Sequence, residues 1–256
     1  MRALILAADR GSRMGPLTLH QPKCLTVVDG RPLLHWQVAA LRRAGLTQFA
    51  IVRGYLAGTL NDPAFTAFNN PHWSETNMVR SLACADAWLQ ADTCLVSCAD
   101  IVFHPDVVKT LAAAPGDIVI AYDRMWKQLW SERFDDPLSD AETFRTRADG
   151  QLVEIGGRAG SFNDIKGQYL GLLKFTPAGW RQAQASFDKL PPAQLDKLDM
   201  TGLLKRLLTE GVPISTAPVD GRWCEVDSAE DLHLYEGLLN EPIPWRHDWR
   251  WEELAP

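Results

Sequence analysis

Short runs of consecutive apolar residues alternate along this chain with longer segments in which apolar residues recur every three to four positions. The continuous runs predict buried strands, as in the centre of a parallel sheet, at residues 3–8, 49–54, 93–100 and 117–123. The periodic segments predict helices at residues 32–45, 74–91, 104–114, 177–189, 198–210 and 228–239. Strands that alternate with helices in this way indicate the α/β class.

Capping signals support several of the predicted helix ends. Ser74 and Ser228 are expected to begin helices, Gly45 to end one, and Pro105 to occupy a first turn. No internal repeat or low-complexity linker interrupts the chain, so we expect a single domain over residues 1–256. The remaining segments are less regular at 126–146, extended at 151–157, 167–176, 213–221 and 223–227, and irregular in a tail at 241–256.

Composition excludes several classes of protein. Hydrophobic residues make up 46% and charged residues 23% of the 256 residues, which excludes an intrinsically disordered chain. No apolar run approaches the roughly 18–20 residues of a membrane span, and residues 3–8 are too few for the apolar core of a secretory signal. We therefore expect a cytoplasmic protein without a membrane partner.

Net charge and cysteine content bear on nucleic acid as a partner and on zinc as a ligand. The formal net charge is −6, and a protein that binds nucleic acid normally presents a basic face, so nucleic acid is not an expected partner. The five cysteines form no CxxC pair, which argues against a zinc site, and free thiols agree with a reducing compartment.

A glycine-containing loop follows the first predicted strand. Loops at the carboxyl ends of central strands are the usual ligand position in open α/β sheets, and small residues let backbone N–H groups approach a phosphate. Arg13 and Lys23 add positive charge to this loop. The loop lacks the GxxxxGK[ST] pattern of a Walker A motif, and taken alone it is equally consistent with a surface loop that has two solvated cations.

The same segment resembles a known family. LAADRGSRM at 6–14, followed by PLT and PKCL, is similar to the signature of nucleotidyltransferases with the GT-A-like, Rossmann-related fold. The blocks NPHWSETNMVRSL, SCADIVF, YDRMWKQLWSERFDDPLSDAETF, GQYLGLLKFTPAGW and WCEVDSAEDL resemble the branch that contains phosphocholine and 2-aminoethylphosphonate cytidylyltransferases.

This resemblance implies a three-layer α/β/α sandwich with a mostly parallel, mixed central sheet. It also implies a reaction between CTP and a small phosphorylated or phosphonate acceptor. Within the single domain, we expect residues 1–125 to bind the nucleotide and residues 126–240 to bind the acceptor, with 241–256 as a C-terminal tail.

Asp9 departs from the family, which usually has glycine at this position. Aspartate tolerates left-handed backbone better than most residues, but it adds bulk and negative charge beside a triphosphate. A nucleotide-binding module with impaired catalysis therefore stays open as an interpretation, although retention of Arg13 and Lys23 argues against it.

Asp100 and Asp227 each follow an apolar run and are expected at strand ends. An aspartate at a strand end is often a turn or cap residue, and Asp227 precedes a predicted helix. In the family, the matching residues hold the metal, so the resemblance favours Mg²⁺ ligation by Asp100 and Asp227.

The reaction that the resemblance implies needs mainly positioning and neutralisation of phosphate charge. The two catalytic residues are then Lys23, which contacts the α-phosphate or the incoming phosphoryl group, and Arg13, which holds the β- and γ-phosphates with the N–H groups of Gly11 and Ser12. The acceptor is already ionised at neutral pH, so no histidine is assigned a catalytic role.

The resemblance places base recognition at the first loop and at the segment around Asn77 and Ser81. These two residues are four positions apart, so on a helix they share a face, and their side chains can read the edge of a pyrimidine, although a helix surface with a cap would have the same pattern. The expected nucleotide-binding residues are Leu6, Ala7, Ala8, Asp9, Gly11, Ser12, Arg13, Lys23, Asn77, Ser81 and Ala99.

Aromatic and acidic residues suggest a pocket for a cationic acceptor, because an ammonium group is stabilised over aromatic faces. Ordinary core packing explains each tryptophan equally well, and uncharged sugar phosphates also bind aromatic surfaces. The expected acceptor-binding residues are Tyr122, Trp126, Trp130, Tyr169, Trp223 and Glu225.

Two further questions stay open at this point. A sugar-1-phosphate nucleotidyltransferase that uses UTP, dTTP or GTP would share Arg13, Lys23, Asp100 and Asp227 and differ only in its base and acceptor pockets. The sequence also leaves open a homodimer and the place where the tail at 241–256 packs.

Overall fold

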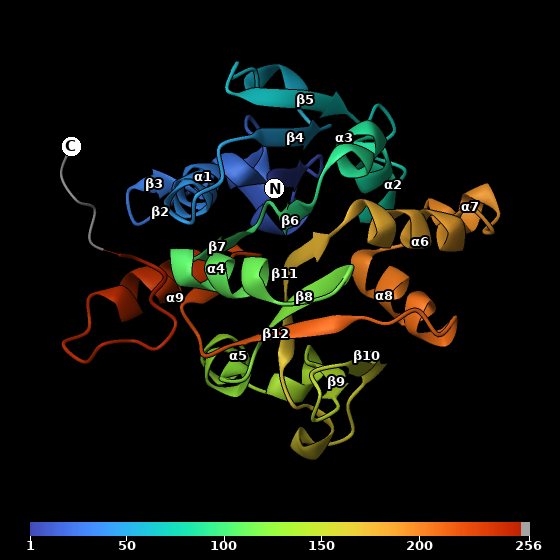
Figure 1. Cartoon of the computed structure of the whole chain (residues 1–256). Coiled ribbons are helices and arrows are strands. Elements are labelled where there is room, and N and C mark those ends of the chain that lie inside the picture. The colour runs from blue at the N-terminus through green and yellow to red at the C-terminus, as the bar shows by residue number, and fades with distance from the viewer. Residues whose placement is uncertain (252–256) are drawn as a thin grey trace.

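The computed structural model describes residues 1–251. Its largest sheet has seven strands in the order β12-β8-β11-β6-β1-β4-β5 (Figure 1). Only β11 runs antiparallel to its neighbours in this sheet, so the predicted mostly parallel, mixed sheet is confirmed. The strands of this sheet are β1 (Arg2–Ala7), β4 (Phe49–Arg53), β5 (Phe65–Asn69), β6 (Cys94–Cys98), β8 (Ile118–Asp123), β11 (Gln168–Phe175) and β12 (Ser215–Val219).

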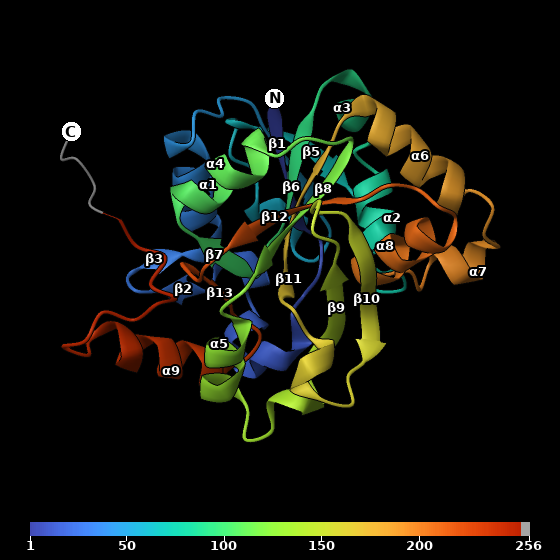
Figure 2. The same cartoon turned by 60° about the horizontal axis from the view of Figure 1, so that its bottom comes forward.

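Helices cover both faces of the sheet, which gives the three expected layers (Figures 1 and 2). Alternate residues of β1 point to opposite faces: Ile5 packs in one hydrophobic cluster and Leu4 in the other. One face is covered by α1 (Leu33–Arg43), α4 (Pro105–Ala113) and α9 (Ala229–Leu239), and the other by α2 (Met78–Ala83), α3 (Asp86–Ala91), α6 (Pro177–Phe187) and α8 (Met200–Thr209).

Smaller elements complete the described chain. The pair β7 and β13 is antiparallel and joins two segments far apart in the sequence. These elements are β2 (Val27–Val28), β3 (Arg31–Pro32), β7 (Ile101–Phe103), α5 (Trp126–Arg133), β9 (Glu142–Thr146), β10 (Leu152–Arg158), α7 (Pro192–Leu195) and β13 (Trp223–Glu225), together with five short 3₁₀ helices.

Most predicted helix ends are confirmed. Gly45 follows α1 with a positive φ of 97°, Pro105 is the first residue of α4, and Ser228 begins α9 through a capping box with Asp231. The single helix predicted over 74–91 is wrong: residues 74–77 form a loop and Asn77, rather than Ser74, caps α2. A second helix, α3, begins at Asp86.

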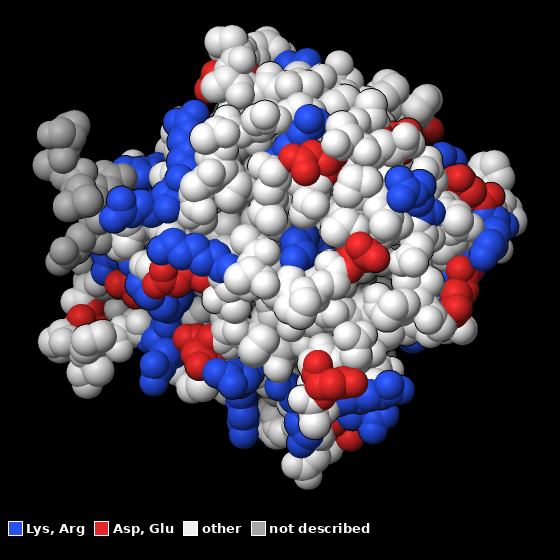
Figure 3. All heavy atoms as spheres, viewed as in Figure 1, with Lys and Arg blue, Asp and Glu red and all other residues white. Residues whose placement is uncertain are grey.

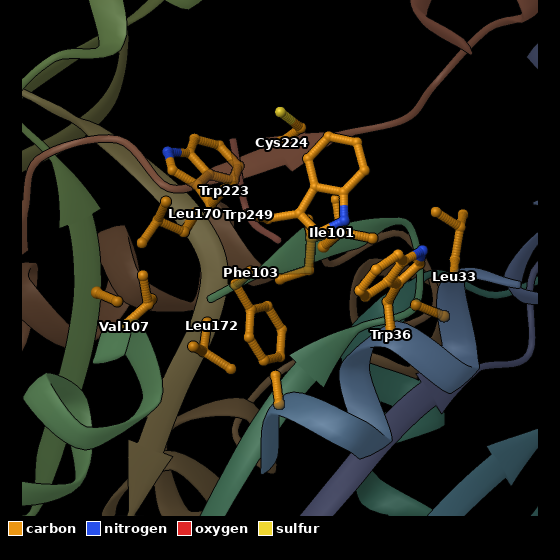
Figure 4. Packing of buried hydrophobic residues seen from close by; sticks show 14 of the residues in the cluster. Leu33, Trp36, Ile101, Phe103, Val107, Leu170, Leu172, Trp223, Cys224 and Trp249 are labelled. Atoms are coloured by element: carbon orange, nitrogen blue, oxygen red, sulfur yellow. The ribbon is translucent and has the colours of Figure 1, made fainter. Parts of the chain in front are cut away.

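Three tryptophans of the predicted tail, Trp245, Trp249 and Trp251, pack against the core. Trp249 is fully buried, and its ring makes edge contacts with Trp36 of α1 and Tyr235 of α9. Figure 4 shows Trp249 between Trp36 and the β13 residues Trp223 and Cys224. The end of the tail, residues 252–256, lies outside the described residues.

The structure shows how surface charge is distributed and whether any described helix could span a membrane. Lysine and arginine side chains are interspersed with aspartate and glutamate over the face seen in Figure 3. Within residues 1–251, no helix is both long and apolar enough to cross a bilayer.

Candidate functional site

The carboxyl ends of β1 and β6 meet at one edge of the sheet, because these strands are parallel neighbours. The loop after β1 contains Lys23, and Asp100 lies in the turn that follows β6. Strand β13 brings the C-terminal part of the chain to the same edge, since it pairs with β7 and the Val226 N–H donates to the Asp100 carbonyl at 2.8 Å. Asp100 and Asp227 are therefore adjacent although 127 positions separate them in the sequence.

The loop after β1 has a fixed shape at Gly11. This residue has a left-handed backbone (φ 70°), and a Cβ at its position would lie 2.6 Å from Cδ of Lys23. Thr18 donates a hydrogen bond from its hydroxyl to the Gly11 carbonyl at 3.1 Å. Glycine is required here for both backbone conformation and space, and it lets the Lys23 side chain lie against the loop.

The ammonium group of Lys23 joins the two aspartates. Its Nζ donates to Oδ2 of Asp100 at 2.9 Å and to Oδ1 of Asp227 at 2.6 Å. Burial alone would lower the pKa of Lys23, but the two carboxylates outweigh it and raise the pKa above its usual range. Arg13 adds a second cation through Nη2 to Oδ1 of Asp227 at 2.9 Å, while its side chain stays 68% exposed at the mouth of the site.

Glu225 belongs to the same carboxylate cluster. One ligand oxygen from each of Asp100, Glu225 and Asp227 lies within 4.8 Å of the others. Burial and the nearby Asp227 raise the pKa of Glu225 to about 7. Burial has the same tendency at Asp227, but Lys23 and Arg13 outweigh it and lower the pKa of this carboxyl.

This donor set fits a hard divalent cation. Mg²⁺ prefers oxygen ligands and uses one or two protein carboxylates together with phosphate oxygens. A cationic group, the Lys23 ammonium, already lies between two of the carboxylates, so the cluster accommodates positive charge.

A cleft of about 530 Å³ lies beside the loop after β1. Asn77 and Ser81 both line it, as their spacing predicts for a shared face. Asn77 donates to the Lys197 carbonyl and Ser81 accepts from Nδ2 of Asn70. The predicted residues Leu6, Ala8, Asp9 and Ser12 also line this cleft, whereas Ala7 and Ala99 are buried in the other hydrophobic cluster and do not line it.

Asp9 has a definite place in the loop. Its Oδ2 accepts a hydrogen bond from the Gly11 N–H at 3.1 Å. The resemblance assigned this N–H group to a phosphate, so in the described structure a carboxylate occupies the donor that a phosphate would use. Lys23 and the N–H of Ser12 are not engaged by Asp9.

A second cleft of about 350 Å³ is lined by Arg13 and by two carboxylates of the cluster, Glu225 and Asp227. Trp130, Tyr169, Trp223 and Glu225, four of the predicted acceptor residues, line it. The Nε1 atoms of the two tryptophans donate to carboxylates, from Trp130 to Asp140 at 3.0 Å and from Trp223 to Asp123 at 3.0 Å.

The other two predicted acceptor residues lie elsewhere. Tyr122 stacks on Phe144 with ring centroids 4.8 Å apart, within the hydrophobic core. Trp126 is buried against Trp130 and Phe162, with centroids 6.1 Å from each. Because Trp126 and Trp130 share one face of α5, Trp126 supports the position of Trp130 without itself lining the cleft.

Sequence reasoning missed the acidic wall of this second cleft. Asp140, Glu142 and Asp199 line it, and burial together with Asp199 and Asp140 raises the pKa of Glu142. The acid-rich stretch DDPLSDAE at 135–142 was a signal for two of them, but Asp199 comes from a distant loop. Glu225 is two positions before Asp227 in an extended segment, so the two side chains share a face, and this alternation would have placed Glu225 in the carboxylate cluster.

Comparison with known proteins agrees with this geometry. Residues 3–158 match the family described as the MobA-like NTP transferase domain. The chain is 33% identical over 250 residues to CTP:phosphoglutamine cytidylyltransferase of Campylobacter jejuni, a match that covers 91% of this chain and 98% of that protein.

One further relative is named for a phosphonate acceptor, and one solved structure was compared with the fold. The chain is 33% identical over 109 residues to 2-aminoethylphosphonate cytidylyltransferase of Lancefieldella rimae, covering 41% of this chain and 44% of that one. The solved CTP:phosphocholine cytidylyltransferase of Streptococcus pneumoniae has the same fold, with a TM-score of 0.70 at 20% identity over 93% of this chain and 99% of that chain.

Proposed function

Because this chain belongs to the MobA-like NTP transferase family of nucleotidyltransferases, we propose that it transfers CMP from CTP to a small phosphorylated or phosphonate acceptor that carries an ammonium group. The observation that carries this proposal is the contact of Lys23 with Asp100 and Asp227 next to two clefts: Asp9 and Ser12 of the loop after β1 line one, and Glu225 and Asp227 line the other. One cleft is lined by Asn77 and Ser81, and the other has aromatic and acidic walls.

In the proposed reaction, an oxygen of the acceptor phosphate or phosphonate attacks the α-phosphorus of CTP. A new P–O bond forms there, the bond to the bridging oxygen breaks, and pyrophosphate leaves with that electron pair. The Lys23 ammonium neutralises the oxygens of the reacting phosphoryl group, and Arg13 at the mouth of the site holds the pyrophosphate portion. The attacking oxygen is already ionised, so the residues of the site need not remove a proton.

Asp100, Glu225 and Asp227 would hold Mg²⁺ in this proposal. A bound Mg²⁺ supplies neutralisation of phosphate charge and a template for the triphosphate. When nucleotide enters, Lys23 exchanges its two carboxylate contacts for contacts with phosphate oxygens.

The acidic wall of the second cleft supports an ammonium-bearing acceptor. Asp140, Glu142 and Asp199 have no ion pair with a lysine or arginine within residues 1–251. Carboxylates accept hydrogen bonds from a primary ammonium, which a quaternary ammonium cannot donate. We therefore place a primary amine here ahead of choline, with Trp130 and Trp223 packing against its carbon chain.

Named acceptors of the relatives define the compounds to test. These relatives act, by name, on phosphoglutamine, 2-aminoethylphosphonate and phosphocholine. The alternative function, transfer to a sugar-1-phosphate from UTP, dTTP or GTP, uses the same Lys23 and aspartates. An impaired nucleotide-binding module is the third reading, and Asp9 is the residue that motivates it.

Initial rates of pyrophosphate release test the proposal directly. CTP, UTP, dTTP and GTP are each combined with 2-aminoethylphosphonate, phosphocholine, phosphoglutamine and glucose 1-phosphate. We expect turnover with CTP and an amine-bearing acceptor. Turnover with glucose 1-phosphate and another nucleotide would establish the alternative, and binding of CTP without turnover on any acceptor would establish the impaired module.

Glu142→Gln provides a matched test of the acceptor wall. Losing one carboxylate beside an ammonium should raise KM for the amine acceptor about tenfold while KM for CTP changes little. The control is Glu154→Gln, because Glu154 pairs with Arg145 on neighbouring strands and does not line this cleft. Equal effects of the two substitutions would remove Glu142 from acceptor recognition.

A further inference from the structure

Arg133 is a charged residue that the reaction as described does not use. It is the last residue of α5 and its side chain is only 2% exposed. Burying a guanidinium is costly unless it is paired, so its partners deserve an explanation. Its guanidinium lies over the rings of Trp130 and Phe134, and its ion-pair partners within residues 1–251 are carboxylates of the site or of the helix that follows it.

The guanidinium contacts three carboxylates at once. Its Nη1 donates to Oε2 of Glu225 at 3.1 Å, and its Nη2 lies 3.6 Å from Oδ2 of Asp227. Nε and Nη2 also donate to the two oxygens of Asp231, at 2.9 and 3.2 Å. A planar fork with fixed donor directions is required to hold these carboxylates together, which a single ammonium cannot reproduce.

Asp231 is itself fixed by the backbone. Its Oδ2 accepts the N–H groups of Asp227 and Ser228 at 2.8 and 3.0 Å, within the capping box of α9. Arg133 is thus anchored at the start of α9 and reaches from there to Glu225 and Asp227. The chain of contacts connects α5, α9 and β13 behind the cluster.

Three cations contact the two oxygens of Asp227. Lys23 and Arg13 donate to Oδ1, whereas Nη2 of Arg133 lies 3.6 Å from Oδ2. Lys23 must leave its carboxylates to reach a phosphate, but the Arg133 fork has no such exchange to make. Carboxylates whose oxygens lie within 4.8 Å of one another repel each other. A site in which they share a cation therefore needs a permanent positive charge that fixes them in place.

We propose that Arg133 is a positioning residue that holds Glu225 and Asp227 in the orientation in which they bind the divalent cation. This inference rests on the proposed function, because it takes the three carboxylates as the ligands of that cation. It assigns Arg133 no contact with substrate. Its effect is exerted entirely through the two carboxylates and Asp231.

The test replaces Arg133 with lysine, which retains the charge and removes the fork. The matched control is Arg124→Lys, because Arg124 makes a forked pair with Asp220 close by in the sequence but at an exposed place outside the cluster. For both variants and the parent, four quantities are measured: the midpoint of thermal unfolding, kcat, KM for CTP, and Mn²⁺ binding in the presence of CTP by electron paramagnetic resonance.

For Arg133→Lys we expect a folded protein whose Mn²⁺ affinity and kcat each fall at least about tenfold, as for other residues that orient metal ligands. KM for CTP should stay within a few-fold of the parent value, since the base and triphosphate contacts are intact. Arg124→Lys should match the parent in all four measurements.

Two outcomes would overturn the inference. Mn²⁺ affinity and kcat equal to those of Arg124→Lys would show that the fork does not orient the carboxylates. A protein that fails to fold with lysine at this position would assign Arg133 a purely structural role. A parent protein that binds no Mn²⁺ in the presence of CTP would instead contradict the proposed function itself, independently of the result with Arg133→Lys.

Discussion

In the proposed reaction, Lys23 cannot contact the two aspartates and the reacting phosphate at the same time. It is therefore the residue whose substitution tests the mechanism most directly. Its ammonium group bridges Asp100 and Asp227, and in the proposed reaction the same group contacts the reacting phosphate. Substitution by methionine, which retains most of the length and removes the charge, separates the two roles.

We expect Lys23→Met to lower kcat/KM for pyrophosphate release at least ~100-fold, because one preorganised charge at a transferring phosphoryl group contributes about 2.7–4 kcal/mol. Lys189→Met is the matched control, since Lys189 pairs with Glu210 at an exposed place and lines neither of the two clefts. An effect within a few-fold of the control would remove Lys23 from the mechanism.

The same substitution should have the opposite effect on metal binding without nucleotide. Removing the ammonium frees both aspartates, so Mn²⁺ should bind the nucleotide-free Lys23→Met protein more tightly than the parent, by about tenfold or more. Electron paramagnetic resonance of Mn²⁺ measures this directly. Unchanged or weaker binding would mean that the ammonium does not compete with the cation.

Asp9 allows a second test at the residue scale. Asp9→Gly removes a carboxylate from the phosphate loop and frees the Gly11 N–H, so it should tighten CTP binding, with a larger gain at low ionic strength. Asp9→Asn removes the negative charge but keeps the hydrogen bond, because the amide oxygen can still accept from the Gly11 N–H. Calorimetric titration of CTP at two salt concentrations measures both; weaker binding by Asp9→Gly would give Asp9 a positive role.

At the scale of elements, α4 has a cap that depends on protonation. Nδ1 of His104 accepts the Asp106 N–H at 3.0 Å, and this nitrogen can accept only while it carries no proton. Burial first, and then the charge of Arg222, lower the pKa of His104 to about 4, against the opposing effect of Asp106 and Asp248.

The folded protein therefore binds the His104 proton more weakly than the unfolded chain, whose pKa is about 6.5. Stability from this group is complete above about pH 6.5 and falls as the pH drops toward 4. His104→Asn retains an acceptor for the cap without titrating. Urea unfolding at pH 7.5 and pH 5 should show a larger loss for the parent than for His104→Asn; equal losses would exclude His104 as the titrating group.

Elements were predictable from the sequence where they are buried and regular. The runs at 3–8, 93–100 and 117–123 became β1, β6 and β8, because a strand buried on both faces is apolar throughout. The edge strand β5 was missed, since FTAFN is short and half-exposed. The split of residues 74–91 was also missed, because Asn77 is fixed by a tertiary contact in which its N–H donates to the Asp196 carbonyl at 2.7 Å, and local periodicity does not report such a contact.

Only some residues of the candidate site could be predicted from the sequence. Lys23, Asp100 and Asp227 follow from motif resemblance and strand ends, but Arg133 and Asp199 enter the site only through the packing of α5 and α8. Tyr122 and Trp126 were assigned to the acceptor by composition, and the structure places them in the core and behind Trp130. The residues around a tryptophan that lines a pocket have the same sequence pattern as those around a tryptophan packed behind it. The sequence alone therefore does not distinguish the two positions.

At the scale of the whole molecule, the tail holds β13 in place from outside. The Arg222 N–H donates to the Arg246 carbonyl at 2.9 Å, and His247 contacts the Asp123 carboxylate that also accepts from Trp223. The tail therefore supports the strand that presents Trp223 and Glu225 to the site.

Trp249→Ala tests this support. Emptying a fully buried tryptophan site should lower the free energy of unfolding by about 3–5 kcal/mol. Ile243→Ala on the same tail is the control, because Ile243 is 77% exposed and its loss should change stability by no more than about 0.5 kcal/mol. Urea unfolding of both variants decides; a Trp249→Ala protein as stable as the control would show that the tail is dispensable.

The central claim is the formation of a diphosphate bond between CMP and the acceptor, and phosphorus NMR observes that bond itself. With CTP, Mg²⁺ and 2-aminoethylphosphonate, the account predicts the appearance of two mutually coupled resonances from an unsymmetrical P–O–P linkage, together with the singlet of pyrophosphate in equal amount. It also predicts that these resonances appear at least ~100-fold more slowly with Lys23→Met. CTP that stays unchanged, or that is only hydrolysed to CMP or CDP with the phosphonate signal unmoved, would contradict it.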